Sequence, residues 1–269
     1  LNIEKKLKEI INNKNEIIRS LTPNYNYSFS KKKLSTLARK NYKIRIIGMG
    51  GSILGSNAIY DFLIHKIKKK ILFFDNLKRK NDYKRNEKNI MNIVVSKSGN
   101  TLETIANANI LVKKKHKNLF IIGSNKNTLR DIALDLKSEI IDHNNFIGGR
   151  YSVLSEVGMV PAALMGFDEK KFKQFNNLIK KKSFLNFLIK SVGQTKNFIK
   201  NKKFNSIILN YDENLNSFLK WYQQLLAESL GKKGTGLLPT ISQMPKDNHS
   251  LMQLFLDGPK NTFFTFFNV

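Results

Sequence analysis

The chain has 269 residues, with 47 Lys and Arg against 20 Asp and Glu, and it contains no cysteine. This length suits one large or two modest domains, and the lack of cysteine excludes disulfides, thiolate nucleophiles and Cys-based metal sites. The sequence has no apolar run near the roughly 18 to 20 residues of a membrane span, and its charged N-terminal segment is unlike a signal peptide. We therefore expect a cytoplasmic protein with no membrane partner.

The formal net charge of +27 is the first feature that suggests a partner. A charge of this size is typical of proteins that bind nucleic acid or anionic surfaces. The lysines, however, fall at predicted helix ends and outer faces in every part of the chain and form no single stripe. We favour a solvated basic surface and expect no nucleic-acid partner, with a nucleic-acid binder kept as an alternative.

The first part of the chain changes from helical to alternating spacing. Residues 1–21 have the pattern of an amphipathic helix, and a polar linker follows to residue 41. From 42 to 150, short apolar runs alternate with segments of helical spacing, which predicts a parallel sheet covered on both faces. Strands are expected at 42–48, 70–75, 89–96 and 118–124, and helices at 52–67, 101–115 and 127–137.

The second part of the chain repeats this alternation after a helical stretch at 151–204. Strands are expected at 205–211, 235–242 and 261–269, and helices at 213–230 and 247–257. Three strands with two helices leave one face and one edge of a sheet poorly covered. Since the chain also starts at Leu1 and ends inside a strand-like run, we expect a second α/β unit truncated from a longer protein.

The glycine cluster "GMGGS" at 48–52 follows a predicted strand and precedes a predicted helix. Backbone N–H groups in such a loop can bind a phosphate. A dinucleotide fingerprint would need glycine at Ile53, and a P-loop would need Lys and Ser or Thr at Ser56 and Asn57. The spacing therefore disfavours nucleotides and leaves open a phosphate site or a simple tight turn.

A second loop of the same kind is "SKSGNT" at 96–101, whose polar side chains are Ser96, Lys97, Ser98, Asn100 and Thr101. Asn100 and Glu103 have the spacing of a helix-capping pair, but capping does not account for the other hydroxyls and the lysine. Because parallel strands bring their C-terminal loops to one edge of the sheet, we expect both loops to meet around one anion. A phosphate is favoured over a loop that only caps a helix.

Two further candidates are far apart in the sequence. Arg150 follows two glycines, where a surface arginine on a flexible turn is the alternative interpretation. On the helix predicted at 213–230, Glu228 lies at the edge of an apolar arc, with Gln224 one turn earlier on the same side. Partial desolvation there would raise the pKa of Glu228 and suit a base, although a solvated glutamate is the commoner case.

His249 is placed by the pattern in the first turn of the helix predicted at 247–257, with Asp247 or Asn248 as its cap. A helix N-terminus disfavours the imidazolium form, which suits a neutral base, although a surface histidine is the ordinary alternative. The chain has no His, Asp and Glu grouping with convincing metal-ligand spacing.

Five motifs, in this order, resemble the glucose-6-phosphate isomerase (phosphoglucose isomerase) family over residues 43–258: "GMGGSILG", "SKSGNTLET", "GGRYSVLSEVGMVPAALMG", "AESLGKKGTGLLPT" and "DNHSLMQ". The resemblance implies an α/β fold of the sugar-isomerase (SIS) type, with two three-layer α/β/α subdomains on parallel sheets, the second incomplete. The division would be an N-terminal helix and linker (1–41), the first SIS subdomain (42–150), a helical connection (151–204) and the start of the second (205–269).

The activity implied by the resemblance is the interconversion of glucose 6-phosphate and fructose 6-phosphate through a cis-enediol(ate), in glycolysis and gluconeogenesis, with no metal or organic cofactor. Glu228 resembles the base, Arg150 the cation that stabilises the intermediate, and His249 the histidine that assists ring opening from the other subunit of a homodimer. The residues that resemble substrate-binding positions are Gly51, Ser52, Ser96, Lys97, Ser98, Thr101 and Gln224.

The chain departs from the family in one respect. The family has a further glutamine and a catalytic lysine in a C-terminal segment, and nothing after Val269 supplies them here. We therefore expect the 269 residues alone to be weakly active at best, and unstable. The alternative function is a non-catalytic sugar-phosphate-binding SIS module, which would need the two loops but not Glu228, Arg150 and His249.

Overall fold

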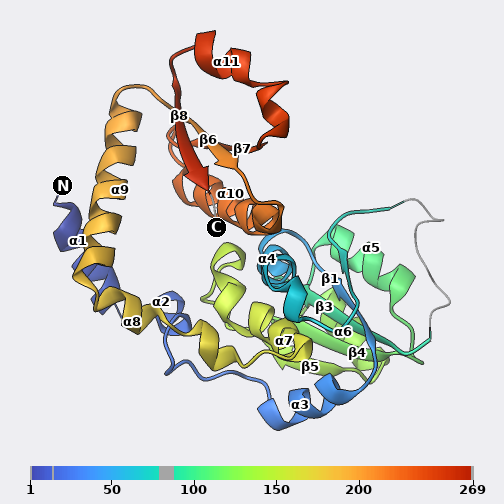
Figure 1. Cartoon of the computed structure of the whole chain (residues 1–269). Helices are drawn as coiled ribbons and strands as arrows, with labels where there is room; N and C mark the ends of the chain where they lie inside the picture. Colours follow the sequence, from blue (N-terminus) through green and yellow to red (C-terminus); the bar gives the residue numbers. More distant parts are fainter. Residues whose placement is uncertain (1, 14, 79–87, 268–269) are drawn as a thin grey trace.

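A computed structural model describes residues 2–13, 15–78 and 88–267 of the chain, which contain two parallel sheets (Figure 1). The first sheet has the order β2-β1-β3-β4-β5, with β1 (Lys43–Ile47), β2 (Ile71–Phe74), β3 (Ile90–Ser96), β4 (Lys117–Ile122) and β5 (Glu139–Asp142). The second has the order β7-β6-β8, with β6 (Asn205–Asn210), β7 (Leu238–Gln243) and β8 (Thr262–Phe267). The predicted α/β fold with parallel sheets is confirmed.

The first sheet is the middle layer of three because its buried strands are apolar on both faces. Ile44 and Ile46 pack on one side, against α3 (Lys31–Arg39), α4 (Leu54–Phe62) and α7 (Glu156–Met165). Ile47 faces the other side, where α5 (Leu102–Leu111) and α6 (Thr128–Asp135) lie. Alternate residues of one strand therefore build two separate cores.

The second sheet lies between α10 (Asn216–Leu230) and α11 (Met252–Asp257) (Figure 1). Ile208 packs with Leu219 of α10, whereas Ile207 packs with Met252 of α11. Helix α10 also packs against α4, and the Ser217 hydroxyl donates a hydrogen bond to Asp61 there. One helix therefore joins the second sheet to the first.

The segment between the sheets is helical, but α7, which lies inside the expected connection of 151–204, packs on the first sheet instead. The rest of the segment contains α8 (Phe175–Ile179) and the long α9 (Lys182–Lys200). Helix α1 (Ile3–Asn12) packs along α9, and every residue of these two helices is at least partly exposed. This helical pair lies beside the two sheets rather than between them (Figure 1).

The prediction of one helix over residues 1–21 is wrong, because the segment forms α1 and a short α2 (Glu16–Ser20). Asn13 has an extended backbone, and the Asn15 side chain accepts a hydrogen bond from the Ile18 N–H as the cap of α2. Asparagine side chains compete for backbone groups in this way and favour helix ends over helix interiors. The predicted linker also contains α3, which Ser30 caps.

Strand β5 was not predicted, and it is short, half-buried and at the edge of the sheet. Its ends are charged residues with partners outside the strand: Glu139 Oε1 lies 2.8 Å from Lys33 Nζ, and Asp142 Oδ1 lies 2.5 Å from Arg130 Nη2. The helix predicted at 101–115 ends earlier, at Leu111, since Val112 is extended. The lysines at 113–115 therefore lie beyond the end of α5.

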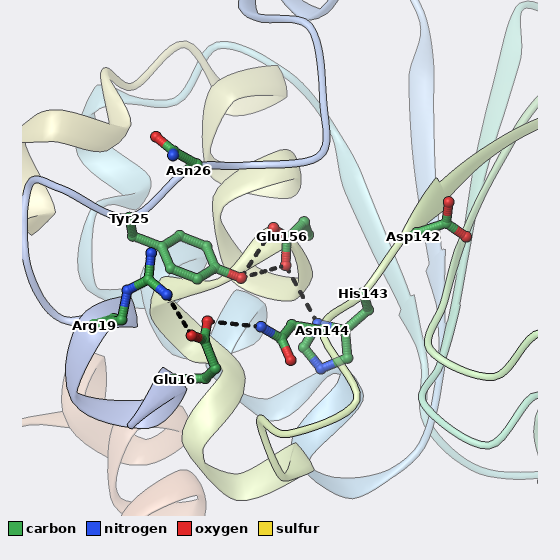
Figure 2. A pocket seen from close by; sticks show the side chains of 8 residues that line it. All are labelled: Glu16, Arg19, Tyr25, Asn26, Asp142, His143, Asn144 and Glu156. Atoms are coloured by element: carbon green, nitrogen blue, oxygen red, sulfur yellow. Dashed lines mark hydrogen bonds and ion pairs between the residues drawn. The ribbon is translucent and has the colours of Figure 1, made fainter. Parts of the chain in front are cut away.

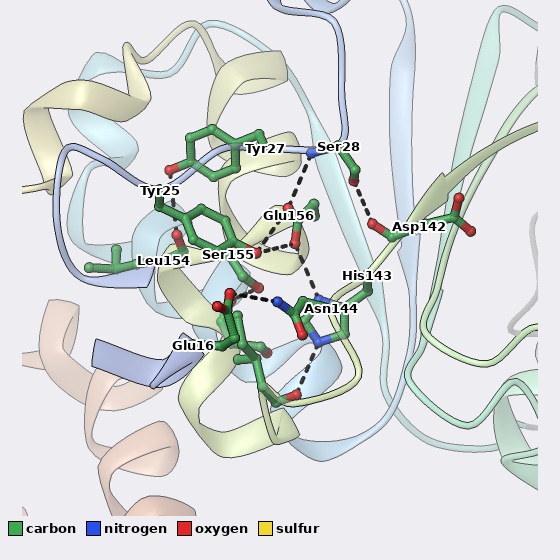
Figure 3. A network of polar contacts seen from close by, with 12 residues as sticks. Glu16, Tyr25, Tyr27, Ser28, Asp142, His143, Asn144, Leu154, Ser155 and Glu156 are labelled. Carbon is green, nitrogen blue, oxygen red and sulfur yellow. Dashed lines mark hydrogen bonds and ion pairs between the residues drawn. The ribbon is translucent and has the colours of Figure 1, made fainter. Parts of the chain in front are cut away.

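A buried carboxylate fastens the segment before α3 to the first sheet (Figure 3). Glu156, at the start of α7, is 2% exposed, and both its oxygens lie 3.1 Å from the Tyr25 hydroxyl. It also accepts a hydrogen bond from the Ser28 N–H (3.3 Å) and lies 3.3 Å from His143 Nδ1. Burial, helped by the Glu156 charge, raises the pKa of Tyr25 and keeps its phenol a donor.

Lys173 is buried beside the aromatic rings of Tyr25 and Tyr27. Its ammonium donates hydrogen bonds to the carbonyls of Ser20 and Leu154, and it lies 5.0 and 4.9 Å from the ring centroids of Tyr25 and Tyr27. Burial lowers the pKa of Lys173 to about 8, although Glu156 and Glu169 act in the opposite direction.

The lowered pKa of Lys173 predicts that the stability of the folded protein depends on pH. The test uses the natural protein that contains these residues. Between pH of about 8 and 10.5 the unfolded chain keeps the Lys173 proton while the folded chain releases it, so stability must rise with pH in this window. The free energy of unfolding of the natural protein should therefore increase relative to that of Lys173→Met from pH 8 to 10.5, in denaturant titrations. A difference that stays constant or decreases over this window would show that burial does not disfavour the charged lysine.

Tyr25→Phe tests the carboxylate network. Removal of one donor to a buried carboxylate should lower the free energy of unfolding by about 1 to 3 kcal/mol. The control is Tyr211→Phe, which removes a hydroxyl from a side chain that is 48% exposed and should change stability by less than about 0.5 kcal/mol. Equal effects of the two substitutions would contradict a structural role for the Tyr25 hydroxyl.

Candidate functional site

The glycine loop after β1 lies in direct contact with the loop that contains Arg150. A Cβ atom added to Gly51 would lie 2.2 Å from the carbonyl carbon of Gly149 and 2.6 Å from the backbone N of Arg150. The Ser152 hydroxyl lies within hydrogen-bond distance of the carbonyls of Gly51 (3.3 Å) and Gly149 (2.7 Å). Gly51 is therefore required by the close approach of two backbones.

Helix α10 meets the same loop from the second sheet. Gly50 has a φ of +51°, and a Cβ atom added there would lie 2.9 Å from Gln224 Nε2. This nitrogen donates a hydrogen bond of 2.7 Å to Glu228 Oε1, and Arg150 Nη1 donates one of 3.1 Å to Glu228 Oε2. The structure thus brings together Arg150, Gln224 and Glu228 beside Gly51.

The exposure of this group differs from the sequence-based expectation. We expected Glu228 to be partly shielded from water, but its side chain is 47% exposed, whereas that of Arg150 is 19% exposed. The carboxylate is oriented by Arg150 and Gln224 rather than by an apolar wall. Gln224 Oε1 is buried and has no hydrogen-bond partner among the described residues.

Arg150 is held by groups that sequence reasoning missed. Its Nε donates to Ser229 Oγ (2.9 Å), and its guanidinium lies 4.5 Å from the ring centroid of Tyr151, whose hydroxyl is 3.0 Å from Ser229 Oγ. Trp221 Nε1 donates to the Arg150 carbonyl (3.0 Å). Burial acts to raise the pKa of Tyr151, but hydrogen bonds with Ser229 and Arg150 outweigh it and lower the pKa.

The hydroxyl loop after β3 is organised by its own side chains. Ser96 Oγ accepts a hydrogen bond from the Gly99 N–H (3.0 Å) and lies 3.2 Å from Thr101 Oγ1, which is 3.5 Å from Ser98 Oγ. The Lys97 carbonyl accepts the N–H groups of Gly123 and Ser124 after β4, at 3.1 Å each. Three hydroxyls are therefore clustered by contacts within the loop itself.

The two loops lie side by side, as the parallel sheet predicts. Strands β1 and β3 are neighbours, with Ile47 opposite Val94. A Cβ atom added to Gly48 would lie 3.0 Å from the Val95 carbonyl oxygen and 3.3 Å from Ser52 Cβ. Ser52 therefore adjoins the start of the hydroxyl loop, at the edge of the sheet where α/β proteins bind ligands.

The predicted capping pair of Asn100 and Glu103 is wrong. Thr101 is the N-cap residue of α5, and Asn100 Oδ1 instead accepts the Thr128 N–H at the start of α6 (3.0 Å). The loop after β4 lies against the hydroxyl loop, and the Thr128 N–H, which has no partner within its own helix, reaches Asn100. Sequence spacing near Asn100 cannot reveal a partner 28 residues away.

His249 is not in the first turn of a helix, because it follows a turn of 3-10 helix at Lys246–Asn248 and α11 begins only at Met252. Asp247 does not cap α11 but accepts hydrogen bonds from the Gln243 N–H (2.7 Å) and the Ser242 hydroxyl (3.0 Å). The argument from a helix N-terminus therefore fails for His249. Its side chain is exposed, and no hydrogen bond between described residues joins it to Arg150 or Glu228.

A separate polar pocket of about 270 Å³ lies where the N-terminal segment meets β5 and α7 (Figure 2). Its charged groups already have partners: Glu16 binds Arg19 (2.5 Å) and Asn144 (2.8 Å), and Asp142 binds Arg130 (2.5 Å). None of the predicted site residues lines it. Its side chains stabilise the contact between the N-terminal segment and the sheet.

The described residues provide neither a cluster of potential metal ligands nor a membrane-spanning helix. They contain no group of three or more His, Cys, Asp or Glu side chains arranged to hold a metal ion. None of the helices in this part of the chain is both long enough and apolar enough to cross a membrane.

Comparison with known proteins gives consistent matches. A family model described as phosphoglucose isomerase matches residues 33–236. The glucose-6-phosphate isomerase of Methanocaldococcus jannaschii is 35% identical over 242 residues, which cover 82% of this chain and 58% of that relative. The chain thus spans less than two thirds of the length of this curated relative.

Two solved structures share the fold. A hypothetical protein from Thermus thermophilus matches 98% of this chain and 69% of its own, with a TM-score of 0.80 and 20% identity. A glucose-6-phosphate isomerase from Chlamydia trachomatis matches 88% of this chain and 52% of its own, with a TM-score of 0.69 and 22% identity.

Gly51→Ala should disrupt the contact between the two loops. The new methyl group would lie well inside the contact distance of Gly149 and must push the backbone at Arg150 away, at a cost of about 1 to 3 kcal/mol. Gly148→Ala is the matched control, since its nearest contact would be an ordinary 3.5 Å to the Tyr151 ring. Thermal unfolding of both variants measures the difference, and a Gly51→Ala variant as stable as Gly148→Ala would refute the backbone contact.

Proposed function

The chain belongs to the phosphoglucose isomerase family, and we propose that the natural protein containing it interconverts glucose 6-phosphate and fructose 6-phosphate in glycolysis and gluconeogenesis. The fold is of the sugar-isomerase (SIS) type. In this proposal, residues 42–150 together with α3 and α7, which cover one face of the first sheet, form the first SIS subdomain, and residues 205–269 belong to the second. The observation that carries the proposal is the contact between the Arg150 guanidinium and the Glu228 carboxylate beside the glycine loop.

The substrate phosphate binds at the two loops that follow β1 and β3. Ser52 adjoins the hydroxyl loop, where Thr101 Oγ1 lies within hydrogen-bond distance of both the Ser96 and the Ser98 hydroxyl. Hydroxyls can turn their protons toward phosphate oxygens, and Lys97 and the Gly51 N–H add positive charge to the same edge. The net charge of +27 further attracts anionic sugar phosphates.

Proton transfer is assigned to Glu228. Its carboxylate removes the proton from C2 of the open-chain aldose, the C–H electron pair forms the C1–C2 double bond, and the C1=O π pair moves to O1. A proton then leaves O2 and one is gained at O1 through water, the C2=O bond forms, and the same carboxyl delivers a proton to C1 to give the ketose. Negative charge develops on the enediolate oxygens, which the Arg150 guanidinium stabilises. Gln224 already binds Glu228, and its buried Oε1 has no hydrogen-bond partner in the part of the chain that the structure describes; we assign it a contact with the substrate.

His249 assists ring opening from the partner subunit of a homodimer. Its exposed position on the 3-10 turn before α11, away from Arg150 and Glu228, is compatible with a contribution across an interface. The reaction moves one proton between adjacent carbons and needs no metal or organic cofactor. The enzyme is placed in the cytoplasm, where its sugar phosphates occur.

A non-catalytic sugar-phosphate-binding module is the alternative. Such a module would use the two loops after β1 and β3 but would have no use for a carboxylate held against an arginine and a glutamine. The hydrogen bonds of Glu228 with Arg150 and Gln224 therefore favour the enzyme.

Glu228→Gln in the natural protein tests the proposal. The amide keeps the size of the side chain but cannot accept a proton, so the kcat for fructose 6-phosphate should fall by about 100- to 10,000-fold. The dissociation constant for fructose 6-phosphate, measured by calorimetry, should change by less than about tenfold, since the phosphate loops are intact.

The control is Glu213→Gln, which alters an exposed glutamate before α10 and should leave turnover unchanged. Retained turnover in Glu228→Gln would refute Glu228 as the base. Wild-type protein that binds fructose 6-phosphate without isomerising it would instead support the non-catalytic module.

A further inference from the structure

The orientation of Arg150 requires an explanation beyond its bond to Glu228. An arginine side chain loses up to about 2 kcal/mol of rotamer entropy when it is fixed, so a stabilising guanidinium must be held before the reaction begins. Glu228 cannot serve as the fixed support, because in the proposed reaction its carboxylate binds and releases a proton. Other contacts must therefore hold the guanidinium.

Helix α10 supplies these contacts at both ends of the arginine. Trp221 Nε1 binds the Arg150 carbonyl (3.0 Å), and two turns later Ser229 Oγ accepts the Arg150 Nε–H (2.9 Å). Trp221 and Ser229 are eight positions apart, a spacing that places two residues on the same face of a helix. The backbone and the side chain of one arginine are therefore fixed by one face of α10.

Tyr151 completes the support. Its ring lies against the guanidinium at 4.5 Å, and its hydroxyl lies 3.0 Å from Ser229 Oγ. Ser229 has a single proton and two lone pairs, so it can accept from Arg150 and donate to the Tyr151 hydroxyl at the same time. Ser229 thus connects the arginine to the ring on which it rests.

The nitrogen atoms of the guanidinium are used differently. Nε binds Ser229 and Nη1 binds Glu228. A guanidinium is planar, so a fixed Nε determines the direction of the other two nitrogens. Ser229 therefore determines where Nη2 points.

We propose that Ser229, supported by Tyr151, is a positioning residue that aims the Arg150 guanidinium at the developing enediolate oxygen. The inference rests on the proposed isomerase function. Ser229 does not contact the reacting carbons and acts through Arg150. Consecutive residues of α10 thus have different tasks, proton transfer at Glu228 and orientation of the cation at Ser229.

Ser229→Ala in the natural protein is the kinetic test. Loss of the hydroxyl frees the Arg150 side chain, and misplacement of a stabilising cation should lower kcat by about 10- to 100-fold with KM changed by less than about threefold. Ser229→Thr restores a hydroxyl and should return kcat to within about threefold of the wild type. The matched control is Ser183→Ala, at an exposed serine of α9, which should leave both constants unchanged.

A second readout does not depend on turnover. The hydrogen bond with Ser229 helps lower the pKa of Tyr151, so Ser229→Ala should raise that pKa while Ser183→Ala should not. Ultraviolet absorbance titration, with Tyr151→Phe subtracted to isolate this phenol, measures the shift.

The outcomes separate this inference from the proposed function. A lack of isomerase activity in the wild type would refute the function, while an unchanged Tyr151 pKa in Ser229→Ala would independently overturn the arrangement of Ser229. An active wild type whose Ser229→Ala variant keeps its kcat, or whose Ser229→Thr variant is no better than alanine, would overturn the positioning role.

Discussion

The site depends on one steric constraint, the direct contact between the backbone at Gly51 and the backbone at Gly149 and Arg150. A side chain at Gly51 would lie within 2.2 Å of the Gly149 carbonyl carbon, so only glycine permits this approach. Through it, the loop after β1 adjoins the residue whose guanidinium faces Glu228. The hydrogen bond between Arg150 and Glu228, which are 78 positions apart in the chain, is thus possible because residue 51 is a glycine and has no side chain.

Helix α10 connects this contact to the second sheet. Its Leu219 packs against Ile208 of β6. Farther along the same helix, Gln224 lies beside Gly50 and Glu228 binds Arg150. The proposed phosphate loops belong to the first sheet, whereas the proposed base belongs to a helix of the second. The relative position of the two sheets therefore determines the distance between the bound phosphate and the carboxylate.

The sequence was most informative where a pattern is local. Alternating strands and helices predicted both parallel sheets, and the glycines after β1 predicted a loop between that strand and the next helix. It failed where a contact joins distant segments: Asn100 binds Thr128 rather than Glu103, and β5 has charged ends that conceal its strand pattern. Ser229 was missed because its partners, Arg150 and Tyr151, come from another part of the chain and leave no periodic signal.

The central claim is that a carboxylate moves a proton between adjacent carbons of the substrate. The most direct test is to let the natural protein convert fructose 6-phosphate in deuterium oxide and to measure deuterium in glucose 6-phosphate by NMR. A carboxyl group that exchanges its proton with solvent predicts deuterium at C2 of the product. Product formed with no deuterium at C2 would contradict the account, because hydrogen would then have passed between the carbons without a base that exchanges with water.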